Sequence, residues 1–196
     1  MTNSLKPTAG GQPRNRDQTT RPLYTPDQRA RRDATPWTLV QGVLAPVQFL
    51  VFLVSLGLVL NVLITGEGYW AATVSVVIKT LVLYAIMITG SIWEKVVFGR
   101  YLFAGPFFWE DVVSIGVLAL HTAYLIAVFA GIGSASDQMW LALAAYAAYV
   151  INAAQFVWKL RLARLDGAAM AQDTQTQSVR GRDDIRPTPI NGAEAY

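Results

Sequence analysis

Three carboxylates stand close together in the sequence, on either side of a short aromatic stretch. Glu94 precedes the stretch, and Glu110 and Asp111 follow it. Carboxyl groups that crowd one another in a poorly solvated place keep a proton more readily than in water, so any of the three is a candidate general acid. The alternative is structural: ion pairs of Glu94 with Lys95 or of Glu110 with Arg100, and a favourable helix dipole at the start of the next helix.

A single histidine, His121, and a complete lack of cysteine limit the chemistry. Without cysteine there are no disulfides, thiolate metal sites, Fe–S clusters or cysteine nucleophiles, and one histidine excludes paired-histidine haem ligation within the chain. We therefore predict no cofactor and no metal held by the protein. His121 is either a packing residue or a group that orients water.

Long apolar runs must position these polar groups, because 53% of the residues are hydrophobic and only 15% are charged. A run of about twenty apolar residues is enough to cross a bilayer as a helix. Period-two alternation, which a strand would show, is absent. The sequence thus predicts an all-α polytopic membrane protein, a four-helix bundle, with spans over residues 37–64, 70–93, 109–130 and 138–160.

Polar tails flank the predicted bundle. Residues 1–22 are basic and have almost nothing to bury, so we predict disorder there and again over residues 166–196. No signal peptide is expected, because polar residues precede the first apolar run. Between the first tail and the first span, Thr25, Pro26 and Gln28 have the pattern of a capped helix start, which predicts a short basic helix on the membrane surface.

Basic residues indicate how the bundle is oriented. Seven of the sixteen lie before Trp37 and six lie from Lys159 onward, while the first and third connections have none. The positive-inside rule then places both termini and the stretch 90–111 on the cytoplasmic side. This charge suits contact with an anionic lipid bilayer, and no aromatic-interleaved basic motif indicates nucleic-acid binding.

Four polar groups are predicted to lie near the middle of the bilayer: Gln48, Lys79, His121 and Tyr149. At about 1.5 Å rise per residue, each is roughly 13–18 Å from a membrane face. Unpaired polar groups are costly in hydrocarbon, so we expect these side chains to face the bundle interior. Lys79 is the hardest to explain structurally, because no acid lies at its depth.

Helical spacing extends these groups into one polar or aromatic stripe on each span. If all four stripes face inward, they line a polar slot whose charged mouth is the stretch 90–111. The stripes are Gln41, Gln48 and Ser55; Thr80, Tyr84, Met87, Ser91 and Glu94; Glu110, Ser114, Val117, His121 and Tyr124; and Tyr149, Asn152, Phe156 and Lys159.

Several long blocks resemble one known family and occur in its order. The family is the C3-vinyl bacteriochlorophyllide hydratase of anoxygenic phototrophic bacteria, named 2-vinyl in an older ring numbering. The resemblance covers residues 23–165 and leaves both tails outside. The blocks are TPDQRARRDATPWTLVQGVLAPVQF, SVVIKTLVLYAIMITGSIWEKVVFGRYLFAGPFFWEDVVS, ALHTAYL and INAAQFVWKLRLARL.

The resemblance implies a membrane-bound lyase of bacteriochlorophyll synthesis, in the inner (intracytoplasmic) membrane. Such an enzyme adds water to the ring-A vinyl group of chlorophyllide a or bacteriochlorophyllide a, and a separate dehydrogenase then oxidises the hydroxyethyl product. No catalytic residues are carried over from the family. A non-catalytic pigment carrier or assembly factor, a homo-oligomer and contacts with neighbouring pathway enzymes all stay open.

The implied reaction assigns roles to the polar and aromatic residues. One of Glu94, Glu110 and Asp111 acts as the acid. His121 orients water or ligates the magnesium of the substrate, and Lys79 binds the ring propionate; these last two roles compete. Residues expected to contact the substrate are Gln48, Lys79, Tyr84, Phe107, Phe108, Trp109, Tyr124 and Asn152, with Phe103 as a further stacking surface.

Overall fold

Residues 23–183 are described by the structure, a computed structural model, and they form helices without a single strand. The all-α prediction is therefore confirmed for this part of the chain. The elements are α1 (Pro26–Ala34), α2 (Pro36–Thr65), α3 (Tyr69–Phe98), the 3₁₀ turn η1 (Gly105–Phe107), α4 (Phe108–Phe129) and α5 (Ala135–Asp183).

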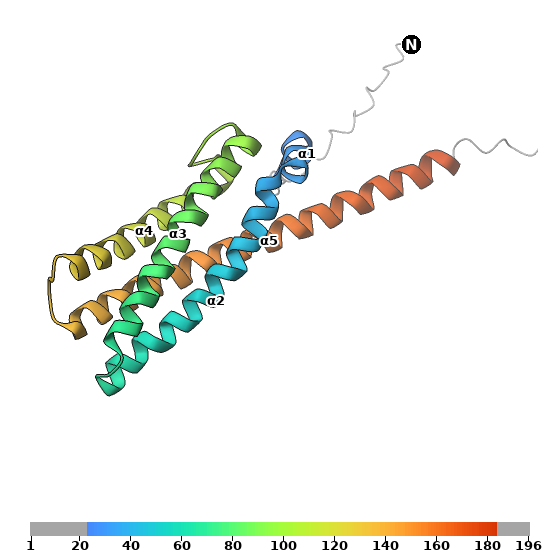
Figure 1. Cartoon of the computed structure of the whole chain (residues 1–196). Helices are drawn as coiled ribbons and strands as arrows, with labels where there is room; N and C mark the ends of the chain where they lie inside the picture. The colour runs from blue at the N-terminus through green and yellow to red at the C-terminus, as the bar shows by residue number, and fades with distance from the viewer. Residues whose placement is uncertain (1–22, 184–196) are drawn as a thin grey trace, which may run out of the picture.

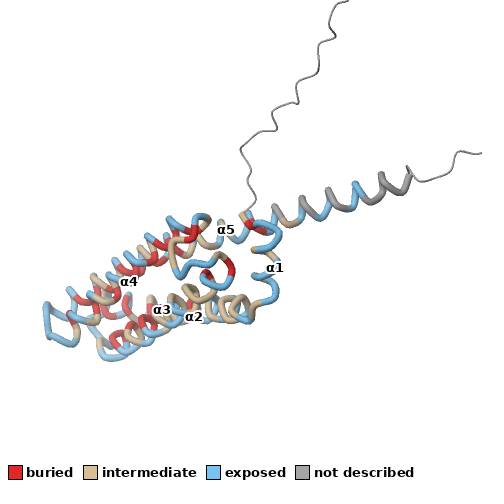
Figure 2. The backbone as a smooth tube through the Cα atoms, turned by 90° about the horizontal axis from the view of Figure 1, so that it is seen from above, coloured by how far each residue is buried: buried red, intermediate tan, exposed pale blue. Residues whose placement is uncertain are grey.

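Four of these helices are long and apolar enough to cross a membrane: α2, α3, α4 with η1, and the 135–165 part of α5. Each predicted span is found, and α3 continues five residues beyond the predicted end at Trp93. Large apolar side chains such as Leu50, Ile64 and Trp70 are exposed on the outside of the bundle. Buried residues gather where the helices face one another (Figure 2). This is the distribution that a bundle surrounded by lipid requires.

The helices pack as two antiparallel pairs, α2 with α3 and α4 with α5, and α2 also packs on α5 (Figure 1). Helix α1, the connection 99–107 and the C-terminal part of α5 lie at one end. The turns at 66–68 and 131–134 lie at the other. Both ends of the described chain thus belong to one end of the bundle. Which side of the membrane this end faces stays a prediction.

Helix α1 begins as its sequence predicts. Thr25 Oγ1 accepts a hydrogen bond from Gln28 N at 3.3 Å, and Gln28 Oε1 accepts one from Thr25 N at 3.0 Å, which is a complete capping box. These two bonds satisfy backbone donors that a helix start otherwise leaves free. The same type of signal recurs at α2, where the Thr35 side chain accepts from Trp37 N at 3.4 Å.

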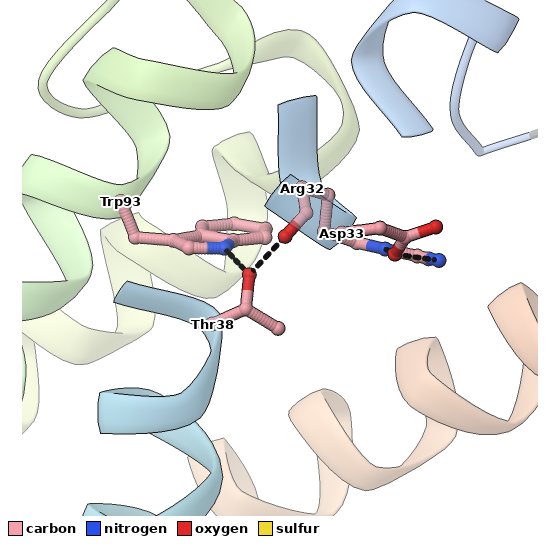
Figure 3. A network of polar contacts seen from close by, with 4 residues as sticks. All are labelled: Arg32, Asp33, Thr38 and Trp93. Carbon is pink, nitrogen blue, oxygen red and sulfur yellow. Dashed lines mark hydrogen bonds and ion pairs between the residues drawn. The ribbon is translucent and has the colours of Figure 1, made fainter. Parts of the chain in front are cut away.

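A three-membered network fixes α1 to the bundle (Figure 3). Trp93 Nε1 of α3 donates to Thr38 Oγ1 of α2 at 2.9 Å, and Thr38 Oγ1 donates to the Arg32 carbonyl of α1 at 2.5 Å. Arg32 also pairs with its neighbour Asp33 at 2.7 Å. Because three helices meet at Thr38, α1 keeps a defined position beside the carboxyl-terminal end of α3.

The C-terminal part of α5 corrects one prediction. Disorder was expected from residue 166 onward, but the helix continues to Asp183 and projects beyond the bundle (Figure 1). This segment contains alanine, glutamine, methionine and arginine, which are good helix formers, and no proline. It also extends a helix that already exists, so it avoids the cost of nucleation. Residues 1–22 and 184–196, for which disorder was also predicted, lie outside the described residues.

Candidate active site

The fold brings the three carboxylates together at the end of the bundle that carries the connection 99–107. Glu94 lies in the last turns of α3, and Glu110 and Asp111 lie in the first turn of α4. All three are buried. We call these three residues the loop-side carboxyl cluster. The predicted meeting of Glu94 with the start of the next helix is therefore found.

Glu94 and Asp111 hold the connection in place. The backbone N–H of Ala104 donates to Glu94 Oε2 at 3.2 Å, and that of Phe103 donates to Asp111 Oδ2 at 2.6 Å. Phe103 has φ +58°, a left-handed conformation that is rare for a residue other than glycine. Its bond to Asp111 stabilises this strained backbone. Both carboxylates thus have a structural task, although it differs from the ion pairs that the sequence offered as the structural alternative.

The same two carboxylates also contact each other. Their carboxyl groups lie within hydrogen-bond reach of one another. Two adjacent carboxylates cannot both be ionised without strong repulsion, and a hydrogen bond between them needs a proton on one. The pair is consequently able to hold a proton for transfer, which is the property expected of a general acid.

Glu110 is held by residues of α5. Its Oε1 forms an ion pair with Lys159 Nζ at 3.5 Å, and Lys159 also donates to the Pro106 carbonyl. Asn152 Nδ2 donates to the Glu110 carbonyl at 3.1 Å and to Ser114 Oγ at 2.9 Å. The other carboxylate oxygen, Oε2, is buried and has no hydrogen-bond partner among the described residues.

The ion pairs considered from the sequence are not those that form in the described chain. Lys95 Nζ donates to the Gly99 carbonyl at 3.0 Å, at the end of α3, rather than to Glu94. Glu110 pairs with Lys159 and not with Arg100. The sequence places Lys159 on the inward-facing stripe of Tyr149 but does not identify it as the partner of Glu110.

The loop aromatics divide into an inner and an outer group. Phe107 is buried inside an aromatic cluster, so it offers no open stacking surface. Phe108 and Trp109 are 43% and 69% exposed and face outward, and the Phe103 and Phe108 rings lie 5.5 Å apart. The partners of Phe107 are Tyr24, Trp93, Phe98 and Phe156.

Deeper in the bundle, Gln48, Lys79, His121 and Tyr149 are buried, as their predicted depth required. We call these four residues the deep polar layer. Lys79 Nζ lies 3.8 Å from the centroid of the Tyr149 ring, a cation–π contact. His121 Nδ1 is 2.8 Å from the Val117 carbonyl, and because a carbonyl only accepts, Nδ1 is the donor. The prediction that these groups face inward is confirmed.

Three atoms of the deep polar layer lack a hydrogen-bond partner among the described residues: Gln48 Oε1, Lys79 Nζ and His121 Nε2. A buried polar atom left in this state costs about 1–3 kcal/mol, and a charged one more. Three such costs form a large part of a typical folding free energy of about 5–15 kcal/mol. Packing alone does not account for polar residues at these positions.

Tyr84 and Tyr124 have separate surroundings. Tyr84 Oη is 2.7 Å from Thr122 Oγ1 and joins α3 to α4, which is the packing role that a polar residue often has between membrane helices. Tyr124 is fully buried, and its Oη lies beside Thr73 but outside hydrogen-bond geometry. Neither residue lies on an open surface within the described bundle.

Tyr146 is a buried residue that the sequence analysis missed. Its Oη is 2.5 Å from Ser55 Oγ, which is 2.6 Å from Ser75 Oγ, and its ring centroid is 5.8 Å from that of His121. Its position three residues before Tyr149, on the same face of α5, was a usable signal. Tyr146 therefore connects His121 to a hydroxyl chain that spans α5, α2 and α3.

Large side chains occupy the interior where the predicted polar stripes meet. Tyr124, Tyr146, Lys79 and His121 are among the largest fully buried residues, because long side chains from α3, α4 and α5 meet in the interior. Two grooves on the outside have volumes of about 440 and 280 Å³. The larger is lined by Thr122, Leu125, Ile126, Phe129 and Ala130, and the smaller by Leu50, Val51, Val54, Ser75 and Ile78.

Metal-binding capacity is limited in the described residues, where no three histidine, cysteine, aspartate or glutamate side chains are grouped to hold an ion. The loop-side carboxyl cluster is committed to backbone N–H groups and to Lys159. His121 offers one free nitrogen to a ligand.

The fold and these two polar regions define a class: a four-span membrane protein with a buried carboxyl cluster at one end and a polar layer inside. Comparison with known proteins is specific. Residues 24–162 match the family described as 2-vinyl bacteriochlorophyllide hydratase, and the chain belongs to that family.

Two relatives carry the same description. The protein from Cereibacter sphaeroides is 67% identical over 162 residues, covering 83% of this chain and 97% of the relative. That from Rhodobacter capsulatus is 69% identical over 147 residues, covering 75% and 85%. No solved structure matches the chain.

Proposed function

We propose that the protein is a hydro-lyase that adds water to the C3-vinyl group of chlorophyllide a or bacteriochlorophyllide a. The product carries a 1-hydroxyethyl group. The observation that carries this proposal is the 67% identity, over 97% of its length, to a relative named 2-vinyl bacteriochlorophyllide hydratase. The geometry adds a buried acid and a buried anion at the same end of the bundle.

Hydration of a vinyl group proceeds by protonation and water addition. A proton adds to the terminal carbon, and positive charge develops on the inner carbon, where the macrocycle delocalises it. Water then forms a C–O bond at the inner carbon and releases a proton. The proton count balances, and the reaction is redox-neutral. The enzyme must therefore supply an acid, a group that accepts a proton from water, and a place for the ring.

The Glu94–Asp111 pair is the proposed acid, because its contact requires a shared proton. Glu110 is the proposed partner of water, since its Oε2 is buried and free among the described residues. Lys159 and Asn152 hold Glu110 in position. After the C–O bond forms, the proton released by water returns to the cluster and restores the acid.

Access to this acid needs a movement of the connection 99–107. Glu94 and Asp111 are 6% and 3% exposed, and the backbone of Phe103 and Ala104 lies over them. Phe108 and Trp109 are exposed beside this connection and suit a first stacking contact with a flat ring that arrives through the membrane. His121 stays a proposed catalytic or magnesium-binding residue, and Gln48, Lys79, Tyr84, Phe107 and Tyr124 stay proposed substrate contacts.

The defining experiment gives the purified protein, in detergent or lipid, chlorophyllide a and water as the only other reactant. We expect the 3-(1-hydroxyethyl) product, with ¹⁸O in the new hydroxyl group when the water is labelled. A pigment carrier would bind the ring and return it unchanged, so unaltered substrate at full binding would overturn the proposal. Chiral analysis of the alcohol then gives the face of attack.

The finer details of location and assembly are part of the proposal. We place the protein in the inner (intracytoplasmic) membrane of a photosynthetic bacterium, with both termini in the cytoplasm. The basic residues of α1 and of the connection, such as Arg31 and Arg100, support this orientation. Reporter fusions at the two termini and in the 66–68 turn test it. A homo-oligomer and contacts with neighbouring pathway enzymes stay predictions.

A further inference from the structure

We propose that the deep polar layer is an internal water-binding site and that it supplies the water that adds to the vinyl group. The second half of this inference rests on the proposed function; the first half does not. Its basis is three buried atoms from three helices, each without a hydrogen-bond partner among the described residues: Gln48 Oε1 on α2, Lys79 Nζ on α3 and His121 Nε2 on α4. Buried polar groups in this state commonly bind ordered water or a ligand.

The chemistry of the three atoms selects water. An ammonium group only donates, and an amide oxygen only accepts. His121 Nδ1 donates to the Val117 carbonyl at 2.8 Å, so Nε2 of the neutral ring accepts. A substrate carboxylate suits Lys79 but is repelled by the two acceptors, and a metal cation suits the acceptors but is repelled by Lys79. Water donates and accepts, so it satisfies all three.

The geometry brings these atoms toward one interior region. His121 and Lys79 both contact the same face of α5, where the Tyr146 ring centroid lies 5.8 Å from that of His121 and the Tyr149 ring lies one turn further along. The Tyr149 ring covers one side of the ammonium group at 3.8 Å, which leaves its other N–H bonds free. Phe52 packs on Tyr149 at 4.9 Å between ring centroids and lies one helical turn from Gln48. Four helices thus enclose the site in apolar surroundings.

A polar line connects this site with the loop-side carboxyl cluster. Tyr149 and Asn152 lie on one face of α5, and Asn152 Nδ2 donates to Ser114 Oγ at 2.9 Å and to the Glu110 carbonyl at 3.1 Å. His121 and Glu110 are eleven residues apart on α4, which is about 16 Å. We infer that water passes from the deep layer to Glu110 along this line when the side chains that fill the interior move.

The test uses the fact that His121 is the one histidine in the sequence. Protein labelled with ¹⁵N-histidine, and purified with a histidine-free tag, gives ring signals from His121 alone. In lipid bilayers, we measure magnetisation transfer from water to this ring by solid-state NMR. The wild type is compared with Lys79→Met and Gln48→Leu. Lys95→Met is the matched control, because it makes the same change on the same helix at an exposed position.

We expect transfer from water to the His121 ring in the wild type and in Lys95→Met, and a clear loss in Lys79→Met and Gln48→Leu. Turnover of chlorophyllide a should fall by about tenfold or more in those two variants, with little change in KM, since water positioning acts on the chemical step. Two independent variants are measured, so that the test still gives a result if one of them fails to fold.

Two results overturn the inference. If no magnetisation passes from water to the wild-type ring, the layer holds no water. If the transfer is lost in both variants while turnover stays normal, the water is structural and does not feed the reaction. A wild type that shows the transfer but yields no hydroxyethyl product contradicts the proposed function alone, so the two failures are distinguishable.

Discussion

The loop-side carboxyl cluster and the deep polar layer are both buried and both rich in ionisable groups, but their atoms are satisfied differently. Glu94 and Asp111 accept hydrogen bonds from the backbone of the connection. Lys79 and His121 each keep a nitrogen without a partner among the described residues. A satisfied buried network rigidifies the structure, whereas an unsatisfied one destabilises the protein until a ligand binds. Glu94 and Asp111 thus stabilise the connection as well as serving as the proposed acid, whereas the deep layer has polar atoms available to a ligand.

Within the carboxyl cluster, Glu110 differs from Glu94 and Asp111 in the partners of its two carboxylate oxygens. One of its oxygens pairs with Lys159, while the other resembles the deep layer in having no partner in the described chain. Glu110 Oε2 therefore lacks a hydrogen-bond partner in the described chain, in the same cluster as the Glu94–Asp111 pair that we propose as the acid. Asn152 links Glu110 to the interior of the bundle through its bonds to the Glu110 carbonyl and Ser114 Oγ, so the two regions are connected here.

The largest effect is expected from removing the carboxyl groups. Glu94→Gln and Glu110→Gln should each lower hydration by about 10²–10⁴-fold, the range for loss of a general acid or base. An amide of the same shape keeps most of the packing but transfers no proton. The measurement is hydroxyethyl product from purified protein, together with accumulation of the vinyl pigment in a complemented null strain.

The control for these variants is Asp137→Asn. Asp137 is an exposed carboxylate at the opposite end of the bundle, where it accepts hydrogen bonds from Ser134. The Asp137→Asn variant should hydrate chlorophyllide a at the wild-type rate. Full product from both glutamine variants, with normal membrane insertion, would show that these carboxylates are not catalytic. The cluster would then only stabilise the connection 99–107.

A smaller loss is expected in the deep layer from His121→Ala, about tenfold or more in turnover, because positioning of water contributes less than the acid itself. The rate at saturating substrate should fall while KM changes little. Turnover equal to that of the wild type would return His121 to a packing role and would weaken the contrast between the two regions.

The change in the free energy of unfolding on replacing a polar residue by an apolar one is expected to have opposite signs in the two regions. Lys79→Met replaces an unpaired buried cation by an apolar side chain of similar shape, and it should stabilise the fold by about 1–3 kcal/mol while hydration falls. Asn152→Leu leaves Ser114 Oγ without its donor and removes one of the hydrogen bonds to the Glu110 carbonyl, which keeps the bond from Ser114 Oγ, and it should destabilise by a similar amount. Thermal unfolding in one detergent compares the two. Equal destabilisation by both variants would make the deep layer structural as well.

The smallest effect concerns α1, which packs beside the carboxyl cluster. Burial raises the pKa of Tyr24 above its ordinary value of 10.0, and the nearby Arg32 guanidinium partly opposes this. A group with a raised folded-state pKa contributes stability below its unfolded pKa, and the contribution is lost as pH rises through the folded value. We expect the docking of α1 to weaken above about pH 10, and Tyr24→Phe to remove this dependence.

Tryptophan fluorescence during an alkaline titration follows this change, since Trp93 donates to Thr38 where α1 joins the bundle. Tyr24→Phe should match the wild type at neutral pH. A variant that loses α1 docking at pH 7 would show that the Tyr24 hydroxyl, and not its ring, holds the helix in place.

Prediction from the sequence succeeded where the signal is local or periodic. The capping box at Thr25, the four spans and the burial of Lys79 and His121 follow from spacing and from the cost of polar groups in lipid. Prediction failed for side-chain contacts between helices, because these depend on which helices pack against each other. The pairing of Glu110 with Lys159 joins residues 49 positions apart, and the stripe that turns Lys159 inward does not show which residue it meets.

By itself, the sequence determined that this is a four-span membrane protein with polar residues in the interior of the bundle. Hydrophobic length and helical periodicity are properties of each segment alone, so no contact between segments is needed to predict them. Only the tertiary structure decided that the slot is filled and that Phe107 is enclosed. It also decided that Glu94 and Asp111 accept backbone hydrogen bonds, while Glu110 Oε2 and the deep polar layer keep atoms without a partner in the described chain. Those outcomes depend on side-chain lengths and on crossing positions of helices, which become defined only when four helices pack together.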